Sequence, residues 1–223
     1  MNPTETLILG IDEAGRGPVI GDMFVACVGF NEGGEGSLIG LGVKDSKRLK
    51  PRVRSALFPR IVEVARVVFV RRYSPGQIDA ANVNDLFVNA VTSAVKSAFE
   101  AGFKVGRVYV DALSSPKHRL KIVEGLPSSV ELVYEFGADR KYPIVAAASI
   151  IAKYLRDAHV RTLHEVYGDF GSGYPSDPRT IKWLSEHAVL EVPIVRRSWS
   201  TLARLGMKPV RKDQGLLKWL GSK

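Results

Sequence analysis

Four carboxylates occupy similar places in the sequence, at or just after the ends of short apolar runs that predict buried strands. Asp12 and Glu13 follow the run Leu7–Ile11, Asp111 follows Arg107–Val110, and Asp139 comes shortly after Val130–Phe136. Clustered acids near a core are costly unless a cation neutralises them, and Mg²⁺ is held by carboxylates together with phosphate oxygens. For Asp12 and Glu13, an exposed strand end with solvated acids is an equally weighted alternative.

These acids converge only if the strands that carry them are neighbours and point the same way. Crevices at the carboxyl ends of strands are where α/β sheets hold ligands. Two metal ions about 3.5–4 Å apart could activate a water and stabilise the leaving oxygen of a phosphodiester. The four histidines form no His-Glu-x-x-His pattern, and a single cysteine cannot build a zinc ribbon, so structural zinc is not expected.

Three further polar stretches could contact a ligand. Gly15-Arg16-Gly17 follows the first acids, and glycines let a backbone approach a ligand closely. Lys44-Asp45-Ser46-Lys47 is a compact polar cluster for which a solvated turn is the favoured interpretation when it is taken alone. Tyr174 lies in the glycine-rich loop Gly168–Pro178, where it either offers a flat face to a sugar or base or anchors the loop on the core. Helical phase does not settle whether Lys153 faces the acids.

The elements that must position these residues alternate between strands and helices. Strands are predicted over Leu7–Ile11, Val19–Phe30, Val67–Tyr73, Arg107–Val110 and Val130–Phe136. Helices are predicted over Pro51–Ile61, Asn84–Ala101, Pro116–Glu124, Pro143–Tyr167 and Arg179–Ala188, and a loop over the glycine-rich Asn31–Gly42. This order predicts an α/β fold with a mixed sheet covered by helices on both faces.

The composition of the 223-residue chain favours a protein that meets polyanions. The net charge is +9, and the segment from Arg196 to Lys223 contributes +7 of it, with eight basic residues and one acid. Nucleic acid is the usual partner of such a protein, and a solubilising tail is the alternative. Cys27, the single cysteine, excludes an intramolecular disulfide and is expected to be a buried thiol. No signal peptide or membrane span is evident, so we expect a cytoplasmic protein with no membrane partner.

Five motifs occur in a characteristic order between Leu7 and Pro178. They are Gly10–Gly17, Lys44–Lys47, Val110–Ala112, Ala138–Lys153 and Gly171–Pro178. In their order and content they resemble ribonuclease HII, the type 2 ribonuclease H, in its archaeal form. The chain beyond about Val192 carries little of this resemblance.

The resemblance implies a ribonuclease H-like mixed β-sheet flanked by helices, with a small helical C-terminal part. It divides the chain into a catalytic domain over residues 1–178 and a helical region with a basic tail over residues 179–223. The implied activity is endonucleolytic hydrolysis of the RNA strand of RNA–DNA hybrids, including single ribonucleotides embedded in duplex DNA. Mg²⁺ or Mn²⁺ would be required, the products would carry 5′-phosphate and 3′-hydroxyl ends, and the setting would be DNA replication and repair.

The resemblance also assigns roles to individual residues. The metal-binding catalytic acids would be Asp12, Glu13, Asp111 and Asp139. The loop that contacts the ribose 2′-hydroxyl would be Gly15, Arg16 and Gly17, and this hydroxyl is what distinguishes RNA from DNA. Tyr174 would pack on the sugar at the RNA-to-DNA junction. Residues near the substrate backbone would be Lys44, Ser46 and Lys47.

The C-terminal stretch Gln214–Leu220 resembles the box by which replication proteins bind a sliding clamp. Its bulky pair comes one position early, so the match is imperfect. A short amphipathic helix folded back on the body is the alternative. Nothing in the sequence indicates an obligate oligomer, and a monomer is expected.

Two other functions compete with the ribonuclease. The first is another two-metal nuclease, such as a Holliday-junction resolvase or an exonuclease, which would cut an all-DNA duplex as fast as a hybrid. The second is a catalytically silent hybrid binder or clamp accessory. The presence of all four acids argues against the silent binder.

Overall fold

The computed structural model describes residues 6–43, 49–113, 116–187 and 190–207. The strands are β1 (Thr6–Ala14), β2 (Met23–Asn31), β3 (Val67–Tyr73), β4 (Lys104–Asp111) and β5 (Glu131–Glu135). The helices are α1 (Gly36–Gly40), α2 (Pro51–Val64), α3 (Pro75–Ala80), α4 (Val83–Glu100), α5 (Pro116–Glu124), α6 (Ala138–Lys141), α7 (Pro143–Tyr167), α8 (Pro178–Glu186) and α9 (Ser200–Arg204). In the parts of the chain that the structure describes, no helix has the length and apolarity needed to span a membrane.

The five strands form one mixed sheet in the order β3-β2-β1-β4-β5. Strand β1 is antiparallel to β2 and parallel to β4, and β4 is parallel to β5. The condition for the acids to converge is therefore met, because β1, β4 and β5 are neighbours that point the same way. The α/β class with a ribonuclease H-like mixed sheet is confirmed.

The chain forms two compact units. The first contains Met1–Ala14, Phe24–Arg71 and Phe87–Leu155, and the second contains Gly15–Met23, Arg72–Leu86 and Arg156–Lys223. Both units are assembled from segments that are far apart in the sequence. The division at residue 178 stays a prediction.

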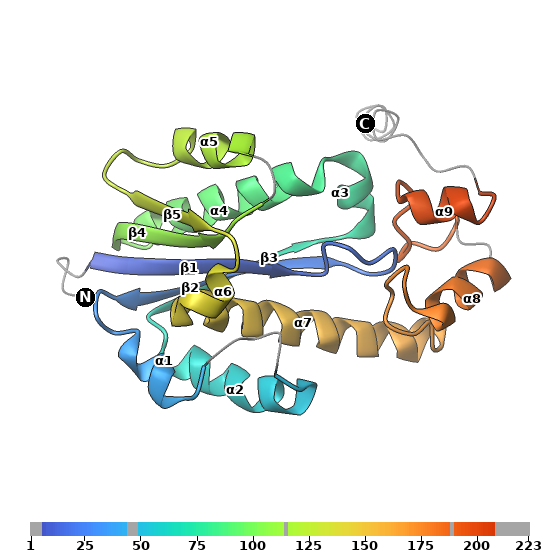
Figure 1. Ribbon diagram of the computed structural model, residues 1–223, viewed down its shortest axis with the longest axis horizontal. Helices are drawn as coiled ribbons and strands as arrows, with labels where there is room; N and C mark the ends of the chain where they lie inside the picture. The colour runs from blue at the N-terminus through green and yellow to red at the C-terminus, as the bar shows by residue number, and fades with distance from the viewer. Residues whose placement is uncertain (1–5, 44–48, 114–115, 188–189, 208–223) are drawn as a thin grey trace. The chain divides into compact units, whose positions relative to one another are not determined.

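In the first unit, helices cover both faces of the sheet. Figure 1 shows α4 and α5 over one face and α1, α2 and the N-terminal part of α7 over the other. The α7 face is a continuous apolar core in which Val28 of β2 packs with Ile61 of α2 and with a run of small residues at the start of α7. Ala146, Ala147 and Ala148 in that run are fully buried, which lets the helix lie close to the sheet.

The second unit has a core of its own. Val19 and Ile20 pack there with Phe170, Trp183 and residues of the last helices. Two backbone contacts tie distant segments of this unit together, since Val19 N donates to Gly173 O at 2.8 Å and Ile20 forms a β-bridge with Val195.

Several predicted boundaries were wrong, and β1 and β4 are each four residues longer than the predicted strands Leu7–Ile11 and Arg107–Val110. Residues 19–22 do not extend β2, because their backbone pairs with residues 173 and 194–196 of the second unit instead of continuing the ladder with β1. The glycine-rich stretch Asn31–Gly42 contains the short helix α1, which forms around the buried Leu38.

Candidate active site

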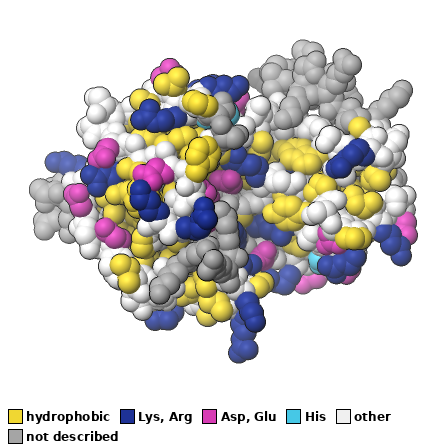
Figure 2. Space-filling view, viewed as in Figure 1, with side chains coloured by type: hydrophobic (Ala, Val, Ile, Leu, Met, Phe, Trp, Pro, Cys, Tyr) yellow, Lys and Arg dark blue, Asp and Glu magenta, His cyan; other side chains and the backbone are white. Residues whose placement is uncertain are grey.

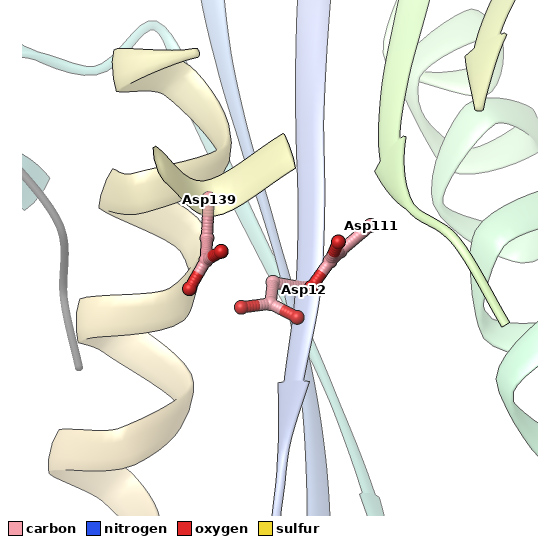
Figure 3. Close-up of side chains that lie close together, drawn as sticks. All are labelled: Asp12, Asp111 and Asp139. Carbon is pink, nitrogen blue, oxygen red and sulfur yellow. The ribbon is translucent and has the colours of Figure 1, made fainter. Parts of the chain in front are cut away.

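Three of the four predicted acids come together at one end of the sheet. Asp12 lies near the end of β1, Asp111 is the last residue of β4, and Asp139 belongs to α6, which follows β5. One carboxylate oxygen from each lies within 4.8 Å of the others. Figure 3 shows the three side chains converging from these separate elements. Asp12 and Asp139 are buried and Asp111 is half-buried.

Strand register explains how Asp12 and Asp111 meet. Ile11 of β1 is the parallel partner of Val110 of β4, so the next residue on each strand is one of the two acids. Asp139 is brought in by a tight turn, in which Gly137 adopts φ +68° and precedes α6. The backbone N–H of Ala138 then donates to Asp111 Oδ1 at 3.0 Å, which ties the start of α6 to the end of β4.

Helix α7 packs closely on β1 next to these carboxylates. A Cβ added to Gly10 would lie 2.5 Å from the backbone of Ile144, so no larger residue fits there without movement of the helix. Glycine two residues before Asp12 thus allows the first turns of α7 to pack directly on β1. Ser149 of α7 hydrogen-bonds through its side chain to the Asp12 carboxylate.

The carboxylate cluster is electrostatically strained. Burial raises the pKa of the Asp12 carboxyl well above its usual range, and the charges of Glu13 and Asp111 raise it further. Hydrogen bonds from the Ser149 hydroxyl and from the Glu13 backbone N–H, at 2.8 Å to Oδ1, lower this pKa but do not offset the burial. A divalent cation would relieve the repulsion, and the donor set consists of carboxylate oxygens, which suits Mg²⁺ or Mn²⁺. The residues present therefore fit a divalent metal.

Lys153 supplies a positive charge that is linked to Asp12 by two hydrogen bonds through Ser149. Its Nζ donates to Ser149 Oγ at 2.7 Å, and Ser149 in turn hydrogen-bonds to Asp12. The two residues are one helical turn apart on α7, so they share a face of the helix. The structure thus answers the question that helical phase left open, because Lys153 lies on the side of α7 that faces the acids.

Glu13 occupies a different position from the other three acids. Its backbone N–H contacts Asp12, but its carboxylate is not in the group whose oxygens lie within 4.8 Å of one another. Side chains alternate along a strand, so consecutive residues of β1 point to opposite faces. A metal-binding role for Glu13 stays a prediction.

The structure brings the Gly15–Gly17 loop and Tyr174 together within the second unit. A Cβ added to Gly17 would lie 3.5 Å from Cε1 of the Tyr174 ring. Gly15 adopts φ +84°, and a Cβ there would lie 2.5 Å from the carbonyl oxygen of Asp22, so only glycine fits. The guanidinium of Arg156 lies 5.0 Å from the centroid of the Tyr174 ring and fixes its face by a cation–π contact.

Several predicted residues lie outside the described parts of the chain. Lys44, Ser46 and Lys47 are among them, and so is the stretch Gln214–Leu220. Their predicted roles remain predictions.

Sequence reasoning missed Arg196, which the structure places against the Gly15–Gly17 loop. It counted this residue only as part of the basic segment, whereas its guanidinium is fully buried and donates to the carbonyl oxygens of Gly15 and Arg16. Composition offers no signal for this role, because a buried arginine and a solvated one look alike in a basic stretch.

Comparison with known proteins shows which family the chain is similar to. The family model described as Ribonuclease HII matches residues 9–202 of the chain. A ribonuclease HII from Hyperthermus butylicus is 41% identical over 226 residues, which cover 95% of this chain and 94% of the relative.

Two solved structures share both fold and sequence with the chain. The crystal structure of ribonuclease H2 from Pyrococcus horikoshii superposes with a TM-score of 0.81 at 37% identity and covers 95% of this chain and 99% of that one. A ribonuclease HII from Archaeoglobus fulgidus, solved in a complex with PCNA, gives a TM-score of 0.78 at 38% identity, with coverage of 90% and 97%.

Proposed function

Because the chain belongs to the ribonuclease HII family, we propose that it is an endonuclease that cleaves at single ribonucleotides embedded in duplex DNA as well as along RNA–DNA hybrids. Membership itself makes the chain a nuclease and hydrolase with ribonuclease H activity on RNA–DNA hybrids. The observation that carries the proposal is the convergence of Asp12, Asp111 and Asp139 within 4.8 Å.

The three converging carboxylates, together with Glu13, are the proposed metal ligands. Bound Mg²⁺ or Mn²⁺ would supply Lewis-acid activation of water and stabilisation of the leaving oxygen of the phosphodiester. The protein's part is to hold the carboxylates close together. Ser149 orients Asp12 by its hydrogen bond, and the Lys153 ammonium behind Ser149 offsets the charge of the cluster. The expected products carry 5′-phosphate and 3′-hydroxyl ends.

Selectivity for ribose is assigned to the Gly15–Gly17 loop and Tyr174. A 2′-hydroxyl is both a donor and an acceptor, so backbone groups of a loop without bulky side chains can contact it. The closeness of the Tyr174 ring to Gly17, where an added Cβ would lie 3.5 Å from Cε1, supports a shared role, because it places an aromatic ring beside the loop. Lys44, Ser46 and Lys47 are proposed to contact the phosphate backbone of the substrate.

Cleavage of a defined duplex tests this function. The substrate is a DNA duplex with one internal ribonucleotide, incubated with Mg²⁺, Mn²⁺ or a chelator, beside an all-DNA duplex of the same sequence. We expect a metal-dependent cut on the 5′ side of the ribonucleotide and none in the control. Equal cleavage of both duplexes would favour a general two-metal nuclease, and tight binding without cleavage would favour a silent hybrid binder.

The C-terminal stretch Gln214–Leu220 is proposed to bind a sliding clamp. The support is the PCNA complex of the Archaeoglobus fulgidus relative and the resemblance of this stretch to a clamp-binding box. A pull-down with the clamp should lose the chain when residues 212–223 are deleted. An undiminished pull-down would remove this proposal.

The basic tail is proposed to strengthen binding to nucleic acid. On the face drawn in Figure 2, Lys and Arg side chains are distributed among acidic ones, whereas the segment from Arg196 onward carries +7 of the net +9 charge. Truncation after Val195 would also remove Arg196, which binds carbonyls of the Gly15–Gly17 loop. Truncation after Met207 keeps this residue and is therefore the cleaner test. It should weaken binding and flatten its salt dependence, because fewer phosphates are neutralised. An unchanged salt slope would contradict this role.

A further inference from the structure

Arg196 is a buried cation that is bound by backbone carbonyls. Its Nε donates to Gly21 O at 2.9 Å, its Nη1 to Arg16 O at 2.8 Å and its Nη2 to Gly15 O at 2.5 Å. The residue is fully buried. Burying a charge is costly unless hydrogen bonds satisfy it, and the fork of donors on a guanidinium can span several acceptors at once. Two of the three acceptors belong to the Gly15–Gly17 loop.

Trp199 holds the third carbonyl of the same loop. Its Nε1 donates to Gly17 O at 3.1 Å, and its ring centroid lies 4.9 Å from the guanidinium carbon of Arg196. All three carbonyls of the Gly15–Gly17 loop are therefore bound by side chains of one four-residue segment, Arg196–Trp199, which we call the anchor segment.

The anchor segment is itself fixed by its backbone. Arg196 N donates to Val19 O at 2.8 Å. The backbone N–H groups of Arg197 and Ser198 donate to the Asp79 carboxylate at 2.8 and 2.9 Å, and the Ser198 hydroxyl donates to it at 2.7 Å. A segment held on both sides in this way can define the position of the loop that it binds.

Because the loop carbonyls are held, peptide geometry also fixes the direction in which the Arg16 and Gly17 N–H groups point. The carbonyl and the N–H of a trans peptide point to opposite sides, and the described residues contain no cis peptide. The Gly15 carbonyl shares its peptide with the Arg16 N–H, and the Arg16 carbonyl shares its peptide with the Gly17 N–H. Because both carbonyls point to the Arg196 guanidinium, both N–H groups point away from it.

We propose that Arg196 is a positioning residue for ribose recognition, which fixes the direction of the Arg16 and Gly17 N–H groups by holding the carbonyls of their peptides. The inference rests on the proposed function, in which this loop contacts the 2′-hydroxyl. Burial lowers the pKa of Arg196 to about 10, so the guanidinium stays charged at neutral pH and all its donors remain available.

The test measures selectivity for ribose separately from fold stability. For the full-length protein, kcat and KM are measured on a duplex with one ribonucleotide, and Ki is measured for the all-DNA duplex as competitor. The ratio of Ki to KM reports selectivity. Arg196→Gln should lower this ratio about tenfold, the loss expected when a hydrogen-bonded contact is misplaced, with a smaller change in kcat. Arg196→Lys should lose selectivity similarly, because one ammonium cannot span three carbonyls.

Leu184→Ala is the matched control for lost stability, since Leu184 is fully buried in the core of the same unit. It should lower the melting temperature without changing the Ki to KM ratio. Trp199→Phe keeps the ring beside Arg196, removes only the bond to Gly17 O, and should lower the ratio by a smaller factor at near-normal stability. This variant also serves if Arg196→Gln does not fold.

The proposal is overturned if Arg196→Gln, Arg196→Lys or Trp199→Phe keeps the wild-type ratio of Ki to KM. Failure of the proposed function would look different. In that case the wild-type protein itself would not distinguish the two duplexes, whatever the variants do.

Discussion

Replacing Asp12 by asparagine should stabilise the metal-free protein and should also prevent metal binding. Asp12 is 5% exposed, and its carboxylate oxygen lies within 4.8 Å of oxygens of Asp111 and Asp139. Two unit charges at this separation repel by about 3 kcal/mol at an effective dielectric constant of 20. The substitution also weakens the charge-assisted hydrogen bonds that Asp12 receives from Ser149 and from the Glu13 N–H, which offsets part of the gain. We therefore expect a net gain of about 1–2 kcal/mol, or a rise of about 2–8 °C in melting temperature for a chain of this size.

Metal should reverse the order of stability. A ligand that binds only the folded state at 100 times its Kd stabilises by about 2.7 kcal/mol. Wild-type protein should gain such an increment from Mn²⁺ or Mg²⁺, and Asp12→Asn should not. Differential scanning calorimetry in chelator and in saturating Mn²⁺ gives all four values.

The pH dependence provides a second check on the same variant. A carboxyl whose pKa is raised in the folded state binds protons more tightly there than in the unfolded chain, where the value is about 3.9. Its contribution to stability is therefore present below that value and is lost as pH rises through the folded-state pKa. In chelator, wild-type protein should lose stability over this range, and Asp12→Asn should lose less.

Glu63→Gln controls for the change in net charge, because Glu63 is an exposed acid on α2. It should leave the melting temperature and the Mn²⁺ shift unchanged. The reasoning is refuted if Asp12→Asn is less stable than wild type in chelator, or if Mn²⁺ stabilises both proteins equally.

Two further predictions concern the residues around the carboxylates and the loop. Gly15→Ala should raise KM for a one-ribonucleotide duplex about tenfold or more, because φ +84° costs an alanine about 1–2 kcal/mol and its Cβ would meet the Asp22 carbonyl. Gly33→Ala, with φ +82° and open space around its Cβ, should leave KM unchanged, and an equal rise in both variants would contradict the account. Lys153→Met should lower the melting temperature by more in chelator than in Mn²⁺, since a bound cation takes over the neutralisation of Asp12; an equal loss in both buffers would disprove that role.

Local patterns in the sequence predicted the two strands that carry Asp12 and Asp111, but not the short helix α6 that carries Asp139. Apolar runs that precede a carboxylate predicted the places of β1 and β4, although β1 continues past Asp12 to Ala14, and the alternation of strands with helices predicted a mixed sheet. The sequence alone did not predict whether β1, β4 and β5 would be parallel neighbours, which is the condition for the acids to converge. Register between strands depends on contacts across the sheet, and the pairing of Ile11 with Val110 met that condition.

Features that depend on residues distant in the sequence were not predictable. Residues 19–22 are apolar enough for a strand, but their backbone partners lie about 150–180 positions later in the chain. Lys153 could not be oriented until α7 was placed on the sheet. Arg196 was indistinguishable from the other basic residues of its segment, because burial of an arginine is decided by the carbonyls that surround it and not by its local sequence.

The central claim is that Asp12, Asp111 and Asp139 bind the divalent metal on which cleavage depends. The most direct test is the cleavage rate of Asp139→Asn on a duplex with one ribonucleotide in saturating Mn²⁺, with duplex affinity measured in parallel. The account predicts a loss in rate of more than about a hundredfold, the upper end of what outer-shell partners of metal ligands typically cost, while affinity for the duplex is largely kept. A variant that cleaves at the wild-type rate would contradict it.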